Sequence, residues 1–88
     1  MASKRPIKSM AWRGGKLIRK GYAATLRGAI TNNVKRMMQN KIAVVEILDR
    51  NEYELALIRH ISIHGSIAVH LSRKGRTTMK KEARTARR

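Results

Sequence analysis

Three histidines are the side chains in this sequence best suited to metal binding or acid–base chemistry. His60 and His64 have the i, i+4 spacing that places two side chains on one face of a helix, and His60 would meet His70 across a hairpin. A structural zinc site needs four ligands, usually including cysteine, and the sequence contains no cysteine. Acid–base attack on an RNA phosphodiester would need a third group to steady the phosphate, and the sequence fixes none. We therefore predict no metal, no cofactor and no enzymatic activity.

Basic residues dominate both ends of the chain. The formal net charge is +16, from 21 lysines and arginines against 5 aspartates and glutamates. Residues 1–45 contain no acidic side chain, and residues 73–88 contain only Glu82. A basic surface that served solubility alone would mix charges of both signs. Self-repulsion at this net charge destabilises a compact chain, so we expect a polyanion to neutralise it.

Nucleic acid is the polyanion that these basic segments fit best. Each phosphate contact releases condensed counterions, and arginine adds bidentate contacts. Trp12 lies among the basic residues, where it would stack on an exposed base, worth about 1–3 kcal/mol, or pack against the core. Because aromatic residues are so few, we expect phosphate and shape contacts rather than base reading. The predicted nucleic-acid-binding residues are Lys4, Arg5, Lys8, Trp12, Arg13, Lys16, Arg19, Lys20, Arg27, Lys35, Arg36, Arg73, Lys74, Arg76, Lys80, Lys81, Arg84, Arg87 and Arg88.

The first 40 residues predict an arm followed by a helix. Residues 1–15 have no sustained periodicity and are interrupted by Pro6 and by Gly14-Gly15, so we predict an extended basic arm. Apolar residues then recur every three or four positions, which predicts an amphipathic helix over 22–38. The apolar stripe of this helix would comprise Tyr22, Leu26, Ile30, Val34, Met37 and Met38.

Residues 41–73 are dense in Ile, Val and Leu with visible alternation, which predicts three antiparallel strands. A turn at Arg50-Asn51 would pair Leu48 with Tyr53, and a three-residue loop over 64–66 would pair His60 with His70. In this register Glu46 is the exception on the apolar face that the helix would cover. The apolar face would comprise Ile42, Val44, Leu48, Leu55, Leu57, Ile61, Ile63, Ile67, Val69 and Leu71.

An alternative interpretation makes residues 50–61 a helix. Asp49 or Asn51 would cap it, with acidic residues in its first turn and basic residues in its last, as the helix dipole favours. The segment GSIAVHL, residues 65–71, resembles the turn and the start of the recognition helix in helix-turn-helix regulators, which place that helix in the DNA major groove.

The C-terminal residues 74–88 form a basic tail in which Thr77 or Thr78 would cap a short helix through Glu82 and Ala83. The stretch GRTTMKKEAR, residues 75–84, resembles the start of the last helix in double-stranded-RNA-binding domains. That family has a Gly-rich loop followed by a Lys-Lys-x-Ala-Lys pattern whose lysines contact phosphates. The order helix, three strands, helix matches the family, whereas its Gly-Pro-x-His signature is absent.

The sequence thus predicts an α+β fold, with one amphipathic helix packed on a three-stranded antiparallel meander over residues 16–73. A basic arm (1–15) and a basic tail (74–88) flank this domain. We expect an RNA-bound, ribosomal-like ribonucleoprotein component that makes non-sequence-specific phosphate contacts, with RNA favoured over DNA. A larger protein or ribonucleoprotein assembly would be a further partner.

Two other functions fit the same charge pattern. One is a small DNA-binding transcriptional regulator of the helix-turn-helix type. The other is a small phage- or plasmid-type protein that binds and modulates a nucleic-acid-processing enzyme. No apolar run reaches the ~20 residues of a membrane span. We expect a cytoplasmic location, with the mitochondrial matrix or the nucleoid as alternatives.

Overall fold

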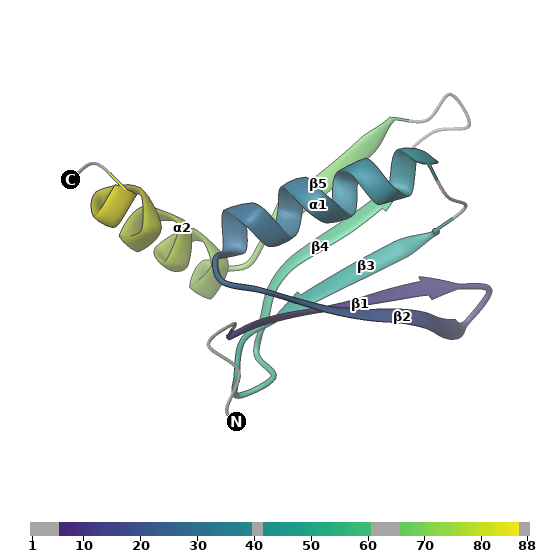
Figure 1. Ribbon diagram of the computed structural model, residues 1–88, viewed down its shortest axis with the longest axis horizontal. Coiled ribbons are helices and arrows are strands. Elements are labelled where there is room, and N and C mark those ends of the chain that lie inside the picture. The colour runs from purple at the N-terminus through teal and green to yellow at the C-terminus, as the bar shows by residue number, and fades with distance from the viewer. Residues whose placement is uncertain (1–5, 40–41, 61–65, 87–88) are drawn as a thin grey trace.

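Two helices pack against one face of a five-stranded sheet (Figure 1). The computed structural model describes residues 6–39, 42–60 and 66–86. The strands are all antiparallel to their neighbours and lie in the order β2-β1-β3-β4-β5. The α+β class is confirmed, whereas the prediction of one helix on three strands is wrong. In chain order the described elements are β1 (Ile7–Arg13), β2 (Lys16–Ala23), α1 (Leu26–Gln39), β3 (Val44–Leu48), β4 (Glu54–His60), β5 (Ile67–Leu71) and α2 (Arg73–Ala86).

Residues 7–13 form an interior strand, so the prediction of an extended arm is wrong for them. β1 pairs with β2 on one side and with β3 on the other. Gly14 and Gly15, with φ of 58° and 78°, form the two-residue turn between β1 and β2. A tight hairpin turn of this kind needs left-handed φ at both positions, which glycine adopts without steric cost. The glycine pair that we predicted to interrupt the chain therefore connects two strands.

Helix α1 begins four residues later than predicted, because residues 16–23 pair with β1 as an edge strand. Thr25 precedes the helix, and its Oγ1 accepts a hydrogen bond from the Gly28 amide at 3.1 Å. Four residues of the predicted apolar stripe contact the core: Leu26 and Met37 are buried, and Ile30 and Val34 pack against it. The other two are exposed, since Met38 points away from the core and Tyr22 belongs to β2.

A carboxylate from α2 caps the first turn of α1. The Leu26 amide donates to Glu82 Oε2 at 2.6 Å, and the Arg27 amide donates to Glu82 Oε1 at 3.2 Å. The first turn of α1 contains no acidic residue of its own, and the free amides of a helix N-terminus carry partial positive charge. Glu82 therefore stabilises α1 and holds α2 beside it.

Replacing this cap should weaken the fold. We expect Glu82→Gln to lower the free energy of unfolding by about 1–2 kcal/mol, because it removes a charged acceptor from two backbone amides. Urea denaturation would measure the loss. Thr85→Ala, on the same helix and exposed, is the control and should leave the midpoint nearly unchanged. Equal midpoints for Glu82→Gln and the wild type would show that the cap contributes nothing.

Helix α2 is longer than the short C-terminal helix predicted, since it begins at Arg73 rather than near Thr77. Ser72 is its N-cap: its Oγ accepts from the Gly75 amide at 3.0 Å and donates to the carbonyl oxygen of Glu54 at 2.6 Å. The Ser72 amide also donates to the Leu55 carbonyl at 3.0 Å. The start of α2 is thus bonded directly to the start of β4.

Burial along β3 shows which face of the sheet the helices cover. Val45 and Ile47 are fully buried, whereas Val44 and Glu46 are half-buried. The prediction therefore placed the wrong face of β3 against the helix. An error of one residue in the alternation exchanges the two faces of a strand. Glu46 pairs with Leu57 on the sheet face away from the helices, which we call the outer sheet face. This placement explains why a carboxylate interrupts the predicted apolar face.

Residues 54–60 and 67–71 are strands, so the helix-turn-helix interpretation is wrong. β4 pairs with β3 on one side and β5 on the other, and this tertiary pairing outweighs the helix-like charge order of the segment. GSIAVHL, read as a turn and recognition helix, instead contains the edge strand β5.

The register of β4 and β5 separates the histidines. His60 pairs with Ile67 and Leu57 pairs with His70, so the predicted pairing of His60 with His70 is wrong. Alternation along the strands places the two histidines on opposite faces of the sheet. The predicted pairing of Leu48 with Tyr53 is also wrong, because Leu48 pairs with Glu54. The predicted face positions Ile61 and Ile63, together with His64, lie outside the described residues.

Candidate nucleic-acid interface

The exposed side of α2 is a strip of basic side chains. Its inner side carries the buried Gly75 and the half-buried Met79 and Glu82. Fourteen residues of helix extend over about 21 Å, so the strip is long enough to follow several phosphates. Figure 1 shows α2 beside the first turn of α1 and extending away from the sheet. The strip, called here the α2 basic strip, consists of the exposed residues Arg73, Lys74, Arg76, Lys80, Lys81 and Arg84.

The α2 basic strip is unfavourable for the helix that carries it. Arg73, Lys74 and Arg76 lie in the first turn, which contains no acidic residue, and cations there oppose the helix dipole. Arg76, Lys80 and Arg84 repeat at i, i+4 spacing, where like charges repel. A helix selected for stability alone would carry acidic residues in its first turn and alternate charges along this row. The arrangement therefore favours a bound anion.

Most acidic side chains lie away from the two helices, but Asp49 lines a hollow of about 370 Å³ together with Arg73, Lys74 and Lys81 of α2. Neither β2 nor α1 contains an acidic residue, and the only carboxylate of α2 is Glu82, which is bonded to the amides of α1. The remaining acidic residues lie on β3, in the turn from β3 to β4, or at the first residue of β4. The surface formed by the outer sides of α1 and α2, called here the helical face, is consequently basic.

The structure brings many of the predicted binding residues together on the helical face, but not all of them. Arg27 and Lys35 are exposed on α1, and Arg36 is half-buried there. Arg13, Lys16, Arg19 and Lys20 are exposed along the β1–β2 hairpin at the sheet edge. Lys8 and Trp12 lie on the outer sheet face instead. Four predicted residues lie outside the described part of the chain: Lys4, Arg5, Arg87 and Arg88.

Trp12 lies on β1, flanked by β2 and β3, rather than on an extended arm. It pairs with Leu17 on one side and Val44 on the other, and it is half-buried. Its indole Nε1 is buried and has no hydrogen-bond partner among the described residues. A ring flanked in this way presents less area for base stacking than an exposed one.

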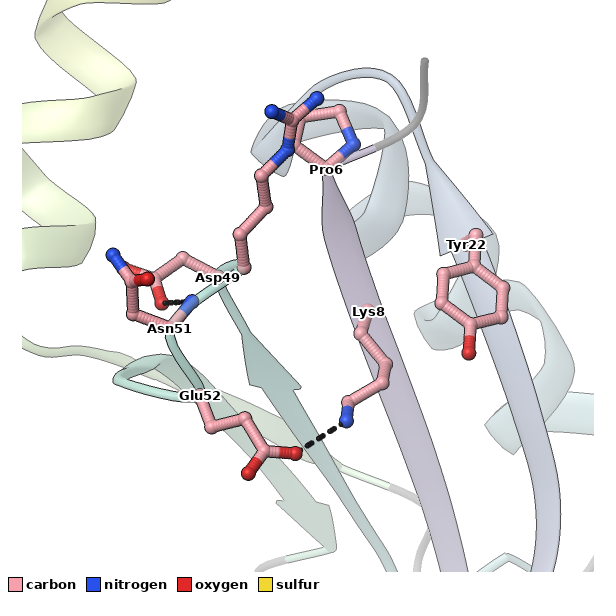
Figure 2. Close-up of a pocket in the computed structure, with 7 residues that line it drawn as sticks. Pro6, Lys8, Tyr22, Asp49, Asn51 and Glu52 are labelled. Atoms are coloured by element: carbon pink, nitrogen blue, oxygen red, sulfur yellow. Dashed lines mark hydrogen bonds and ion pairs between the residues drawn. The ribbon is translucent and has the colours of Figure 1, made fainter. Parts of the chain in front are cut away.

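Lys8 lines a hollow of about 500 Å³ at the end of the outer sheet face, together with Tyr22 and the turn from β3 to β4. Figure 2 shows Lys8 reaching toward Glu52, and its Nζ lies 2.7 Å from Glu52 Oε1. Glu52 has a left-handed φ of 64° and follows a turn organised by Asp49, whose Oδ1 accepts from the Asn51 amide at 2.8 Å. Because carboxylates line it beside basic groups, this hollow is poorly suited to an anion.

The Lys8–Glu52 pair should make stability depend on pH. The hydrogen bond from Lys8 lowers the pKa of Glu52 below its ordinary 4.5, and the hydrogen bond to Glu52 raises the pKa of Lys8 above 10.5. The stabilisation is therefore complete between pH 4.5 and 10.5; it is lost as pH falls through the folded-state pKa of Glu52 or rises through that of Lys8. We expect the Tm difference between wild type and Glu52→Gln to be constant in this window and to shrink in acid. A difference that persists unchanged in strong acid would contradict this assignment.

Two structural residues near α2 were not predicted as part of this site. Tyr53 lies under Lys74, whose Nζ is 3.7 Å from the ring centroid. A cation over an aromatic ring at an exposed site is worth about 0.5–1 kcal/mol, so Tyr53 helps to position the first turn of α2. Glu82 was predicted only as a helix residue. The sequence contains no local signal for either contact, because both partners lie far away along the chain.

Among the described residues, no group of three or more His, Cys, Asp or Glu side chains lies close enough to hold a metal ion. No helix in the described ranges is both long and apolar enough to span a membrane. Comparison of the chain with protein-family models, curated proteins and solved structures finds no match.

Proposed function

We propose that this protein binds nucleic acid through backbone phosphates, as a non-enzymatic ribonucleoprotein component. The observation that carries the proposal is the separation of charge in the fold. The helical face presents the α2 basic strip with Arg27 and Lys35, while four of the five acidic residues lie in or around β3 and the start of β4. Charge separation of this kind is the electrostatic footprint of a phosphate-binding surface.

RNA is favoured over DNA by the shape of the fold. The described chain from α1 to α2 has the order helix, three antiparallel strands, helix, which is the order in the double-stranded-RNA-binding domains that residues 75–84 resemble. Lys80 and Lys81 lie in the second half of α2, not at its start as in that family. The resemblance therefore supports RNA as the ligand, and the contacts proposed here differ from those of the family.

The proposal predicts a binding mode without sequence preference. Fluorescence anisotropy with a duplex RNA, a DNA duplex of the same sequence and the single RNA strand would test it over a series of salt concentrations. We expect the duplex RNA to bind most tightly, with log K falling linearly against log salt. Absence of binding at low salt would refute the function. Tighter binding to the DNA duplex at every salt concentration would refute the assignment to RNA.

A further inference from the structure

A second basic feature lies away from α2, in a hollow of about 220 Å³ between the edge strand β2 and α1. Two arginines line it, Arg19 from the strand and Arg36 from the helix, together with Asn32 and Asn33. None of its lining residues is acidic. This hollow differs in that respect from the one at Lys8, where carboxylates accompany the basic groups.

The strand register and the helical repeat explain why these residues line one hollow. Arg19 pairs with Ala11, and Gly21 pairs with Ser9, so both residues of β2 lie on the side of the sheet that α1 covers. On α1, Asn32 and Asn33 precede Arg36 by four and three residues, which places them on one side of the helix. The hollow is thus built from rigid elements rather than from a loop.

Polar groups inside the hollow are held in place. Ser9 and Asn33 are each only 8 % exposed. Asn33 Nδ2 donates one of its hydrogens to the Ala29 carbonyl at 2.8 Å, which fixes the amide. Gly21 leaves space beside the Ser9 hydroxyl, since a Cβ built on Gly21 would lie 3.1 Å from Ser9 Oγ. A small ligand would therefore meet a fixed amide group near a hydroxyl group.

The presence of two arginines and no carboxylate in the lining favours an anion. Like charges that line one hollow repel each other, and an anion between them replaces repulsion by attraction. Arginine holds phosphate through paired N–H donors, and such charge-assisted bonds are among the strongest in proteins. We propose that this hollow is a phosphate seat, in which Arg19 and Arg36 hold one backbone phosphate of the bound nucleic acid and Asn32 and Ser9 supply further polar contacts.

This inference rests on the proposed function and extends its interface. The seat lies at the β2 edge, whereas α2 packs on β4 and β5 at the other side of the sheet. Both lie on the helical side of the molecule, where α1 also carries the exposed Arg27 and Lys35. A nucleic acid that contacts the α2 basic strip and the phosphate seat together would cross α1.

Inorganic phosphate is the first probe of the seat. Two-dimensional ¹⁵N NMR spectra of the full chain would be recorded while phosphate replaces chloride at constant ionic strength. We expect saturable shifts at the backbone amides of Ser9 and Gly21 and at the Asn32 side chain. The double variant Arg19→Gln/Arg36→Gln should weaken this binding by roughly tenfold or more. Shifts that do not saturate, or that also appear when chloride is added without phosphate, would contradict a phosphate-binding hollow.

Two further variants separate a seat from general charge. Lys16→Gln/Lys20→Gln removes the same charge from β2 without touching the lining of the hollow, and should leave phosphate binding nearly unchanged. Gly21→Ala keeps the charge but fills space beside Ser9, and should weaken phosphate binding several-fold. Thermal denaturation of each variant checks that the fold persists. Equal loss in both double variants would overturn the seat, because general charge would then explain the binding.

Duplex RNA distinguishes the two sources of phosphate. If the seat holds a backbone phosphate, Arg19→Gln/Arg36→Gln should lower the slope of log K against log salt by about one. An unchanged slope would overturn the assignment to nucleic acid while the proposed function stands. Saturable phosphate binding in a chain that binds no nucleic acid would refute the proposed function and assign the seat to a free phosphate compound.

Discussion

Gly75→Ala should destabilise this protein more than the same replacement at any other glycine in the described ranges. A Cβ at position 75 would lie 1.9 Å from the carbonyl oxygen of Leu55 and 2.9 Å from its carbonyl carbon. Both atoms belong to the backbone of β4 and cannot rotate away, so α2 would have to move off the sheet. We expect a loss of about 3 kcal/mol in the free energy of unfolding, at the upper end of the range for overpacked sites.

Gly28→Ala is the matched control for this change, because it also adds a methyl group to a helix. Its Cβ would meet only the side-chain Oγ1 of Thr25, at 3.0 Å, and a small shift of this exposed side chain relieves the contact. Alanine is a better helix former than glycine by about 1 kcal/mol, so the net change should be small. Urea denaturation followed by circular dichroism would compare the two. Equal stability of Gly75→Ala and the wild type would mean that α2 does not pack closely on β4.

Neutralising the α2 basic strip should have the largest effect on binding. One exposed row along the helix consists of Arg76, Lys80 and Arg84. Among the described residues, these side chains hold no other part of the fold through a hydrogen bond or ion pair. With all three changed to glutamine, we expect affinity for duplex RNA to fall roughly 50-fold and the salt slope to fall by about three. Helix stability should rise slightly, because repulsion at i, i+4 is removed. Loss of binding together with a gain in stability would identify a functional surface.

A second triple variant controls for net charge. Lys20, Arg50 and Arg59 lie on β2, in the turn from β3 to β4 and on β4, away from the helical face, and all three are exposed. Changing these to glutamine removes the same charge from three separate places, and we expect at most a few-fold loss of affinity. Equal losses in the two triple variants would contradict a localised interface, since net charge alone would then explain binding.

The sequence contained enough information for the fold class and for the charge, but not for the pairing of strands. The apolar stripe of α1 and the strand content of 41–73 were predictable, because both follow from local periodicity. The hairpin at Gly14-Gly15 was also readable in principle, since a glycine pair between two short segments is a common turn signal. The basic residues around it obscured the strands, because they suggested a solvated arm rather than an edge of a sheet.

The wrong face predicted for β3 shows why strand pairing was harder to predict than fold class. Val44 and Val45 are equally apolar, so the strand can be drawn with either face toward the helix. Only Glu46 distinguished the two choices, and its position on the wrong face was the available warning. Local sequence also could not show that Glu82 caps α1 or that Arg19 and Arg36 line one hollow, because each arrangement joins separate elements of the chain.

Chemical-shift mapping with a short RNA duplex would show whether nucleic acid binds along α2. The amide spectrum of the full chain, recorded before and after adding the duplex, locates the surface that nucleic acid covers. We predict that the largest changes occur along α2 from Arg73 to Arg84 and at exposed residues of α1, with little change at Met10, Glu46 and Leu57 on the outer sheet face. Changes concentrated on the outer sheet face, with α2 unaffected, would contradict the account.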